Sequence, residues 1–592
     1  MRFVDLVAAY EKLGATKKRL ELRKILVELI SNAPRSELPE ILYLSQGMLR
    51  PEYEGVELGL ADSLVRRALV LATGAKESEV ALLARETGDL GTTAERLVAG
   101  RSGTPTKERS VQDVYRHFQQ VASSSGEGSQ ETKIRLLAEL VEGASPIEAK
   151  YAIRFAMGQL RLGIREMSLL DALAEAFADG SKEARTRLEG AYNLCSDLGI
   201  VASTVAASGL EGLSSIHLSV GRPIRPMLAE RSPDLTDVLK RMEGRAALEF
   251  KYDGLRIQAH IPAEGSATLF SRRLENITGQ FPELVRELPK AIRHRPAIVE
   301  GECVAVDLDT DELEPFQEIS RRRGRKYDLE RMETEVPVRL FLFDVLLEGK
   351  DEVLAQDFAD RRARLEKLVT PTDRVRLATQ KVVENLEQAT KFFDLAIAEG
   401  CEGVMAKSLA EGSSYRAGAR GFWWIKYKRE YTHTLGDTID GVVVGGFFGR
   451  GRRAGTFGAL LMATYDKQLD RFESFCKVGS GFDDATLAEL PQRLKSFEVD
   501  ERPQGVETGL EPDRWIRPSL VLELRGAELS LSPIHRAGFG KIRAGTGLAL
   551  RFPRFTGRFR DDKSATEATE SDELLRMYRI QPRHSSPESP AA

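Results

Sequence analysis

The chain has 592 residues, of which 42% are hydrophobic and 30% charged, the balance of an ordinary soluble globular protein. Its length predicts three or four domains. We expect no transmembrane span, because no apolar run reaches about 18 residues, and the first five residues lack the basic-then-apolar layout of a signal peptide. The four cysteines form no C-x-x-C pair, which argues against a zinc site or disulfide framework and favours a reducing cytoplasm: Cys195, Cys303, Cys401 and Cys476.

The net charge of −4 and a pI near 6.2 do not by themselves indicate nucleic-acid binding. Local clusters of charge are more informative than the sum. Three basic clusters occur, and each alone is more often a solvated loop than a DNA contact: Arg321-Arg322-Arg323-Gly324-Arg325-Lys326, Arg450-Gly451-Arg452-Arg453, and the group Arg551, Arg554, Arg558, Arg560 and Lys563.

Residues 1–222 are predicted to form an all-α domain. Apolar residues recur there at three- and four-residue spacing, as on one buried helix face: Leu22, Ile25, Leu26, Leu29 and Ile30. Similar patterns cover 58–73, 79–86, 131–142 and 166–178. A glycine- and serine-rich break at 123–129 ends in Gly128 and Ser129. Free N–H groups at the following helix start could bind a phosphate, although a plain helix cap explains these residues equally well.

Residues 223–430 are predicted to form a mixed α/β domain, in which short β-type runs alternate with helical stretches. The β-type runs are 247–251, 255–261, 297–306, 338–345 and 403–407, and the helical stretches include 359–368 and 388–399. Residues 431–583 are β-rich with glycine turns, with runs at 439–447, 457–465, 472–478 and 519–524, which predicts a small β-barrel and a final helix near 570–580. The Pro/Ser-rich tail 584–592 is predicted to be disordered.

The most informative segment is Glu249-Phe250-Lys251-Tyr252-Asp253-Gly254-Leu255-Arg256. A nucleophilic lysine must lose its proton at neutral pH, which requires desolvation or nearby positive charge. Gly254 allows a sharp turn after Lys251. Arg256 can grip a phosphate or ribose oxygen, and Glu249 can accept a hydrogen bond from a base amine. Alone, however, K-x-D-G is more often a charged strand end followed by a turn.

Five further segments follow in order: Phe270-Ser271-Arg272-Arg273-Leu274-Glu275-Asn276, Glu300-Gly301-Glu302, Phe341-Leu342-Phe343-Asp344, Glu402-Gly403-Val404-Met405-Ala406-Lys407, and Trp424-Ile425-Lys426-Tyr427-Lys428. With these six segments the chain resembles the covalent nucleotidyltransferases, namely DNA ligases, RNA ligases and mRNA capping enzymes. The resemblance to archaeal-type ATP-dependent DNA ligases extends nearly end to end. It includes Leu160-Arg161-Leu162-Gly163-Ile164, Lys477-Val478-Gly479-Ser480-Gly481-Phe482 and Arg551-Phe552-Pro553-Arg554-Phe555.

This resemblance implies a nucleotide-binding site around Lys251, which would attack ATP and form a lysine–AMP intermediate. It implies that Arg272 contacts the nucleotide and the 5′-phosphate of the nick, and that the adenine stacks on Phe343, whose position in an apolar run also suits core packing. Lys426 and Lys428, which share one face of a predicted strand, would hold the α-phosphate and help keep the Lys251 amine neutral.

Glu302 and Glu402 would bind Mg²⁺ (or Mn²⁺) together with the phosphates of ATP, although a lone glutamate is usually a solvated charge. The resemblance makes the C-terminal domain an oligonucleotide-binding barrel. Four of its basic residues would orient the pyrophosphate during self-adenylation: Arg551, Arg554, Arg558 and Lys563. A hinge is expected near Arg429-Glu430-Tyr431, so that the barrel can then turn another face to DNA.

The function implied is ATP-dependent sealing of 5′-phosphate/3′-hydroxyl nicks in duplex DNA, in replication, repair and recombination. The helical domain would be the DNA-binding module, with Gly128, Ser129 and Arg272 as DNA contacts. We expect a cytoplasmic, nucleoid-associated, prokaryotic monomer without membrane contact. The clamp-binding box of many archaeal ligases is a glutamine followed by an aromatic pair, and neither occurs in 99–105, so sliding-clamp binding through this segment is not expected.

Two other functional classes remain open from the sequence. An RNA ligase or capping guanylyltransferase shares the motifs but does not need a helical region of more than 200 residues. A catalytically inactive DNA-binding scaffold would not need to retain Lys251, Glu302, Glu402, Lys426 and Lys428. The sequence does not fix the preferred nucleotide among ATP, ADP, GTP and NAD. It also carries Glu300 where aspartate is common in the family, a difference expected to matter little because Glu302 is retained.

Overall fold

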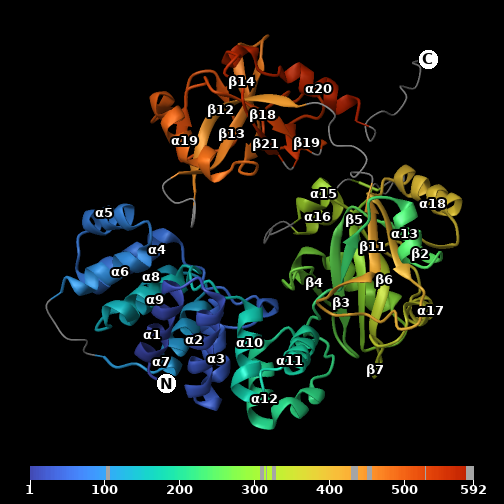
Figure 1. Cartoon of the computed structure of the whole chain (residues 1–592), viewed down its shortest axis with the longest axis horizontal. Coiled ribbons are helices and arrows are strands. Elements are labelled where there is room, and N and C mark those ends of the chain that lie inside the picture. The colour runs from blue at the N-terminus through green and yellow to red at the C-terminus, as the bar shows by residue number, and fades with distance from the viewer. Residues whose placement is uncertain are drawn as a thin grey trace. The chain divides into compact units, whose positions relative to one another are not determined.

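The computed structural model describes residues 1–101, 107–306, 313–314, 316–322, 329–428, 438–449, 456–526, 528–551 and 553–581. It confirms the predicted fold class, since a helical region, a mixed α/β region and a β-rich region follow one another along the chain (Figure 1). The chain forms two compact units. The first comprises Met1–Ser232, Thr236–Ala389 and Met405–Lys426, and the second comprises Pro233–Leu235, Thr390–Val404 and the chain from Tyr427 onward.

The N-terminal region is built from amphipathic helices around one hydrophobic core. In α2, Leu26, Leu29 and Ile30 are buried and Leu22 and Ile25 pack against the core at its edge, which confirms the predicted apolar face. The helices are α1 (Phe3–Ala15), α2 (Arg19–Asn32), α3 (Leu38–Gln46), α4 (Asp62–Thr73), α5 (Glu77–Thr87), α6 (Leu90–Ala99), α7 (Val111–Ser123), α8 (Ser129–Val141), α9 (Pro146–Ala156), α10 (Glu166–Phe177), α11 (Lys182–Cys195) and α12 (Leu198–Gly212).

The central region contains two β-sheets. One has the order β1-β11-β10-β2-β9 and the other has the order β4-β3-β5-β6-β7, with β8 paired to β6. The strands are β1 (Leu228–Arg231), β2 (Ala246–Lys251), β3 (Leu255–Ile261), β4 (Thr268–Ser271), β5 (Ala297–Ala305), β6 (Val338–Glu348), β7 (Asp351–Glu352), β8 (Val375–Leu377), β9 (Gln380–Val383), β10 (Gly403–Ser408) and β11 (Arg420–Lys428).

Helices pack on the sheets where the strands are buried along nearly their whole length, as in β2, β5 and β6. In β5 and β6 almost every residue is buried, and their apolar side chains form one core with α14 and α17. The helices of this region are α13 (Leu235–Arg241), α14 (Pro282–Ala291), α15 (Phe316–Ser320), α16 (Leu329–Glu335), α17 (Phe358–Leu368) and α18 (Leu386–Ala398). The predicted strands and helices are therefore present, with ends that differ from the predicted ones by a few residues at most.

The C-terminal region contains an eight-stranded sheet that curls into a half-barrel, as predicted from its β-rich sequence. Its main order is β15-β17-β12-β13-β14-β16, and β18 pairs with both β12 and β21. The elements are β12 (Ile439–Phe448), β13 (Phe457–Asp466), β14 (Arg471–Val478), α19 (Asp484–Leu494), β15 (Glu498–Val499), β16 (Val506–Glu507), β17 (Arg514–Ile516), β18 (Val521–Arg525), β19 (Glu528–Ser532), β20 (Gly547–Arg551), β21 (Arg554–Phe559) and α20 (Ser571–Arg579).

The helical core extends to Leu213 and Ile216, and the next residues, Leu218, Ile224 and Met227, pack instead with Ile298 of β5. The predicted boundary between 222 and 223 falls within this linker and stays a prediction. The predicted boundary between 430 and 431, the hinge at 429–431 and the tail 584–592 lie outside the described residues. Among the helices that the structure describes, none is long and apolar enough to cross a membrane.

Candidate active site

Lys251 is the last residue of β2, at the point where a buried strand reaches the surface. The five residues before it are buried, whereas Lys251 itself is partly exposed. The loop that follows is anchored by Tyr252, whose ring stacks on Phe341 at 4.1 Å between centroids and whose hydroxyl accepts a hydrogen bond from the Thr379 N–H at 3.1 Å. The strand end therefore presents the Lys251 amine from a rigid support.

Gly254 is required by the close approach of two strands. A Cβ atom at this position would lie 2.3 Å from the carbonyl oxygen of Cys303 and 3.1 Å from Cγ of Glu302. Its φ is not in the left-handed region, so the turn does not depend on the conformational freedom of glycine that the sequence suggested. Without a side chain here, β3 can pair with β5 in the register that sets Arg256 opposite Glu302.

Glu249 is a buried carboxylate, only 2% exposed, with three polar partners. Lys407 Nζ lies 2.8 Å from its Oε2. The Gln380 side-chain amide donates to Oε1 at 3.0 Å, and Arg362 lies 3.5 Å from the same oxygen. Because all three partners are donors or cations, Glu249 is held as a charged acceptor.

Lys407 was part of a motif but received no role from the sequence. Its ammonium group donates to the Phe343 carbonyl at 3.0 Å and lies over the rings of Phe343, Phe358 and Trp424, 4.6 to 4.7 Å from their centroids. Burial lowers the pKa of Lys407, and the ion pair with Glu249 opposes that shift. The signal available in the sequence was a lysine inside the otherwise uncharged strand β10.

Arg256 is held from several sides. Its guanidinium donates to the Met227 carbonyl at 2.8 Å and to Glu300 at 2.7 Å, and it lies 5.3 Å from the centre of the Phe343 ring. Burial alone would lower the pKa of Arg256, but the Glu300 carboxylate and the Tyr415 hydroxyl outweigh burial and raise it. Arg256 thus carries a fixed positive charge next to the predicted adenine-stacking ring.

Glu300 connects this arginine to a buried polar network. The carboxylate is 1% exposed and accepts from Tyr415 at 2.8 Å and from Gln258 at 3.2 Å. Gln258 also accepts the His260 ring N–H at 2.9 Å, since His260 Nδ1 accepts the Gly221 N–H at 3.0 Å. The sequence assigned Glu300 no role of its own, whereas the structure makes it the centre of a network that reaches the linker before β1.

The first of the two predicted metal ligands, Glu302, lies within a strand, whereas the second, Glu402, lies just before another strand. Glu302 is a partly exposed residue of β5. Glu402 precedes β10, and its carboxylate pairs with Lys428 Nζ at 2.7 Å. Gly403 allows this pair, because a Cβ there would lie 2.2 Å from the Tyr427 carbonyl oxygen. No group of three or more His, Cys, Asp or Glu side chains suited to a metal occurs among the described residues.

Lys426 and Lys428 share a face of β11, as predicted. Both are partly exposed, whereas Ile425 and Tyr427, which alternate with them along the strand, are buried. The sequence suggested that an anion lies between the two ammonium groups. The structure shows that the carboxylate of Glu402 already meets the charge of Lys428.

Arg272 lies at the exposed end of β4, in a turn with Leu274 at a φ of 70°. A cleft of about 650 Å³ opens beside it, lined by this turn and by residues 48–57 of the helical region. Arg50 and Arg273 supply further positive charge to the lining, whereas Glu52, Glu57 and Glu275 supply negative charge. The lining of the cleft therefore carries charges of both signs, and the phosphate contact of Arg272 stays a prediction.

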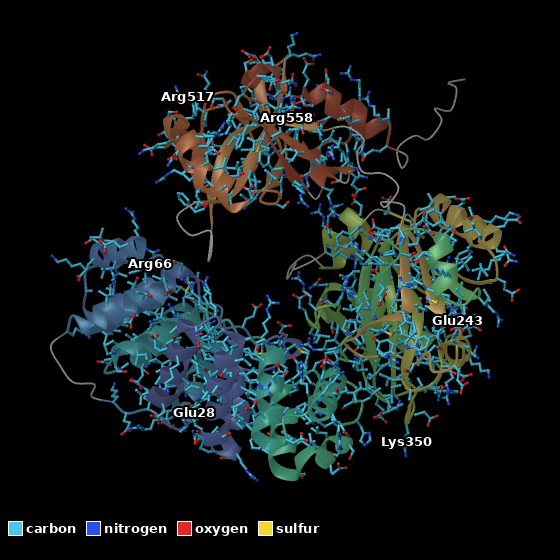
Figure 2. The ribbon with its side chains drawn as sticks, viewed as in Figure 1. Glu28, Arg66, Glu243, Lys350, Arg517 and Arg558 are labelled. Atoms are coloured by element: carbon cyan, nitrogen blue, oxygen red, sulfur yellow. The ribbon has the colours of Figure 1, made fainter. Side chains whose placement is uncertain are left out.

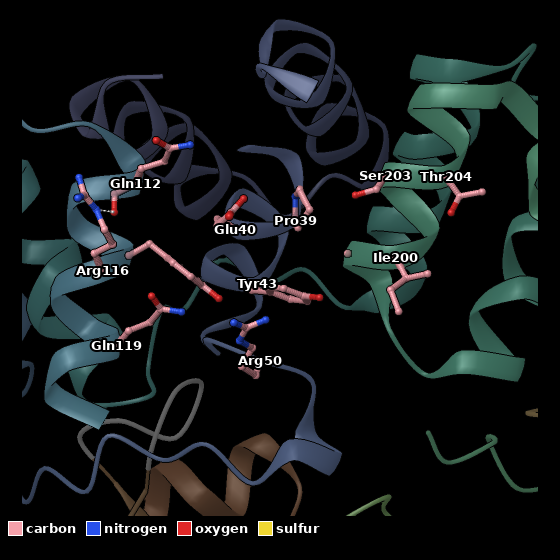
Figure 3. A pocket seen from close by; sticks show the side chains of 12 residues that line it. Pro39, Glu40, Tyr43, Arg50, Gln112, Arg116, Gln119, Ile200, Ser203 and Thr204 are labelled. Carbon is pink, nitrogen blue, oxygen red and sulfur yellow. Dashed lines mark hydrogen bonds between the residues drawn. The ribbon is translucent and has the colours of Figure 1, made fainter. Parts of the chain in front are cut away.

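The predicted phosphate contact in the helical region lies at the start of α8. Gly128 occupies the N-cap position with a φ of 77°, and no side chain caps the helix. Gly128 is itself the N-cap residue, so a plain helix cap still explains this glycine, while the DNA contact stays a prediction. A second cleft of this region, about 490 Å³, lies among α3, α7 and α12 and has a lining of mixed polarity that includes Arg50 and Arg116 (Figure 3).

In the C-terminal region the structure joins two motifs that are more than 70 residues apart. The Phe555 N–H donates to the Ser480 carbonyl at 2.9 Å, and the rings of Phe482 and Phe555 stack at 4.8 Å. A Cβ on Gly481 would lie 2.1 Å from the Phe555 carbonyl oxygen. Arg554 is exposed at the start of β21.

The other basic residues of this motif are partly paired. Lys563 and Arg560 both contact one oxygen of Asp440, at 2.7 and 2.6 Å. Arg558, labelled in Figure 2, is exposed on β21 and lies 3.6 Å from Glu523. Of the four predicted pyrophosphate-binding residues, Arg554 and Arg558 are exposed on β21, and Arg551 ends β20 in a separate two-stranded sheet. Lys563 follows β21 and is oriented by Asp440.

Three family models match the chain in order. They are "DNA ligase N terminus" over residues 2–174, "ATP dependent DNA ligase domain" over 226–428 and "ATP dependent DNA ligase C terminal region" over 453–563. The central match contains every proposed nucleotide and metal residue from Glu249 to Lys428, including Lys251.

Relatives with curated names are similar over almost their whole length. A protein named DNA ligase 2 from Thermofilum pendens is 48% identical and aligns with 97% of this chain and 96% of its own. A probable DNA ligase from Aquifex aeolicus is 45% identical over 98% of this chain and 99% of its own, and a DNA ligase from Saccharolobus solfataricus is 42% identical over 100% and 99%. A solved structure titled Pmar-Lig_Pre. matches with a TM-score of 0.54 at 16% identity, covering 94% of this chain and 99% of that one, and supports the fold alone. The chain belongs to the family of ATP-dependent DNA ligases.

Proposed function

We propose that the chain seals nicks in duplex DNA through a covalent lysine–AMP intermediate on Lys251. ATP as substrate, a divalent metal and nicked DNA follow from the family. The observation that carries the choice of residue is the position of Lys251, partly exposed at the end of a buried strand, with the base-binding candidate Glu249 two residues before it. Side chains two residues apart on a strand share one face.

In the first step the neutral Lys251 amine attacks the α-phosphorus of ATP. A nitrogen–phosphorus bond forms, the bond from this phosphorus to the bridging oxygen of pyrophosphate breaks, and pyrophosphate leaves. In-line attack requires the triphosphate to be held still. We propose that Lys426 and Lys428 hold the α-phosphate, and that Arg554 and Lys563 of the C-terminal region orient the departing pyrophosphate.

The adenosine part is proposed to lie against Phe343. The ring is partly exposed and packs against Trp424, with 6.0 Å between the ring centroids and 84° between the ring planes, so its orientation is fixed before the base arrives. Glu249 accepts a hydrogen bond from the base amine. Arg256 contacts the ribose or a phosphate, and Glu300 and Tyr415 fix the orientation of its guanidinium.

The divalent metal is proposed to bind Glu302 and Glu402 together with phosphate oxygens of ATP. Two carboxylates plus phosphates suit Mg²⁺, which keeps several waters, and Mn²⁺ takes the same ligands. When bound, the metal supplies positive charge that stabilises the phosphate oxygens. Since Lys428 pairs with Glu402, this lysine holds the carboxylate in place until the substrate arrives.

In the second step the nick 5′-phosphate attacks the phosphorus of lysine–AMP, and Lys251 leaves. In the third step the 3′-hydroxyl displaces AMP and the phosphodiester forms. We propose that Arg272 holds the 5′-phosphate, and that Gly128 and Ser129 hold the DNA backbone at the uncapped start of α8. The protein is proposed to act as a nucleoid-associated monomer in replication, repair and recombination. We propose no sliding-clamp contact through 99–105, of which residues 102–105 lie outside the described part.

The test is incubation with α-labelled ATP and Mg²⁺, followed by a denaturing gel. We expect a labelled protein band that disappears in Lys251→Ala. It should persist in Lys350→Ala, a control that removes an exposed lysine from the same region (Figure 2). A wild-type chain that takes no label, or a label that survives in Lys251→Ala, would refute the assignment. A nick-sealing assay with ATP, ADP, GTP and NAD then identifies the preferred nucleotide.

A further inference from the structure

The two residues proposed to contact the base are connected by a third, Lys407. Its ammonium group lies 2.8 Å from the Glu249 carboxylate and 3.0 Å from the Phe343 carbonyl oxygen, and 4.7 Å from the centre of the Phe343 ring. The Lys407 side chain is 1% exposed and that of Glu249 is 3% exposed. An ion pair this deeply buried is costly to form, so its position beside the base site calls for a reason.

The surroundings of Lys407 strengthen its interaction with Glu249. Phe343, Phe358 and Trp424 enclose the ammonium group on several sides and exclude water from it. In such a low-dielectric site the attraction between the charges exceeds that of an exposed pair. The Glu249 carboxylate is thereby fixed in both charge and orientation.

The other groups that face Glu249 also hold its carboxylate as a hydrogen-bond acceptor. Arg362 of α17 lies 3.5 Å from Oε1, and the Gln380 amide of β9 donates to that oxygen at 3.0 Å. A carboxylate surrounded by these donors can only accept hydrogen bonds. A substrate atom that donates is therefore favoured at Glu249, and one that accepts is repelled.

We propose that Lys407 is a positioning residue for nucleotide selection, which holds Glu249 as the charged acceptor that distinguishes adenine from guanine. Adenine carries an amine at C6, which donates, whereas guanine carries a carbonyl there, which accepts. A buried acceptor that faces another acceptor instead of a donor weakens nucleotide binding much more than the loss of an apolar contact does. The inference rests on the proposed function, because it assumes that the nucleotide attacked by Lys251 places its base at Glu249 and Phe343.

The experiment measures self-adenylation with ATP, GTP and purine riboside triphosphate, which has neither amine nor carbonyl at C6. For wild type, Lys407→Met and Glu249→Gln, the rate of label transfer is measured against nucleotide concentration. In Lys407→Met we expect the ratio of kcat/KM for ATP to that for GTP to fall at least tenfold, mainly through a higher KM for ATP. The preference for ATP over purine riboside triphosphate should fall with it, because both depend on the C6 amine.

Two controls separate selection from simple loss of stability. Lys150→Met removes a mostly buried lysine that pairs with Glu11 and Glu95 in the helical region, 5.8 Å from the Tyr151 ring, so it matches the chemical change away from the site. It should lower the melting temperature without changing the nucleotide ratios. In a Glu249→Gln background, Lys407→Met should change the ratio by less than threefold, because Lys407 acts through Glu249.

The outcomes are distinguishable. Suppose that the wild type takes label. If Lys407→Met then has the wild-type ratios of kcat/KM between nucleotides, or if Lys407→Met changes these ratios as much in the Glu249→Gln background as in the wild type, the inference is wrong and the proposed function stands. Should Lys407→Met fail to fold, Glu249→Gln decides, since an unchanged ATP-to-GTP ratio in that variant also refutes the inference. A wild type that takes no label from ATP refutes the proposed function itself.

Discussion

Replacing Gly254 with alanine tests how closely the catalytic loop and the strand carrying Glu302 must approach. The added Cβ would lie 2.3 Å from the Cys303 carbonyl oxygen, and real Cβ contacts essentially never fall below 3.0 Å. The start of β3 and β5 must therefore separate by at least 0.7 Å (3.0 minus 2.3). Overpacking of this kind costs about 1–3 kcal/mol of stability.

The effect on activity should be larger than the effect on folding. A displacement near 1 Å at a reacting group costs about a hundredfold in rate. We expect Gly254→Ala to form lysine–AMP about 100 times more slowly at saturating ATP, because Lys251 lies three residues before the clash. The assay is single-turnover label transfer from α-labelled ATP, beside a thermal melt.

Gly279→Ala is the matched control, because nothing lies within 4 Å of its added Cβ and its φ is not in the left-handed region. This variant should adenylate and melt like the wild type. If Gly254→Ala adenylates within threefold of the wild type while remaining folded, the argument from close approach is wrong.

Two further predictions concern the buried network behind Arg256. Burial lowers the pKa of His260 to about 3, below its unfolded value, so its contribution to stability is full above about pH 6.5 and declines as the pH falls toward 3. Urea titrations should show that the free energy of unfolding of the wild type falls by about 2–3 kcal/mol more than that of His260→Gln between pH 6.5 and pH 4.5. The same dependence of unfolding free energy on pH in both proteins would contradict this. Tyr415→Phe removes a hydroxyl that donates to Glu300 at 2.8 Å and accepts the Met227 N–H at 2.9 Å. It should raise the KM for ATP about tenfold and cost about 1–3 kcal/mol of stability. Tyr43→Phe is the control, because it also removes a hydroxyl bonded to a buried carboxylate, and it should lower stability without changing the KM for ATP. An unchanged KM for ATP in Tyr415→Phe would refute the positioning role of Tyr415.

Much of the fold could be predicted because the elements carry strong local patterns. The strand predicted at 255–261 is β3, and the helix predicted at 388–399 is α18 with ends two and one residues earlier. Alternation and helical periodicity depend only on which face is buried, so they can be read without knowing the neighbours. Strand pairing could not be predicted, since β2 pairs with β9 and lies beside β10, more than 100 residues away in the chain.

The order of the three regions, the family and the choice of Lys251 as the candidate nucleophile could all be read from the residues alone. They depend on residue types in a fixed order, which a linear motif records fully. The surroundings of each motif residue, in contrast, follow only from the way the strands pack. The tertiary structure pairs Lys407 with Glu249, Arg256 with Glu300, and Lys428 with Glu402 as ion pairs. A charge in a motif can face a substrate, a metal or another charge, and this choice depends on which strands approach each other. In this protein glycines allow two of these approaches, since a side chain on Gly254 or Gly403 would collide with the neighbouring strand.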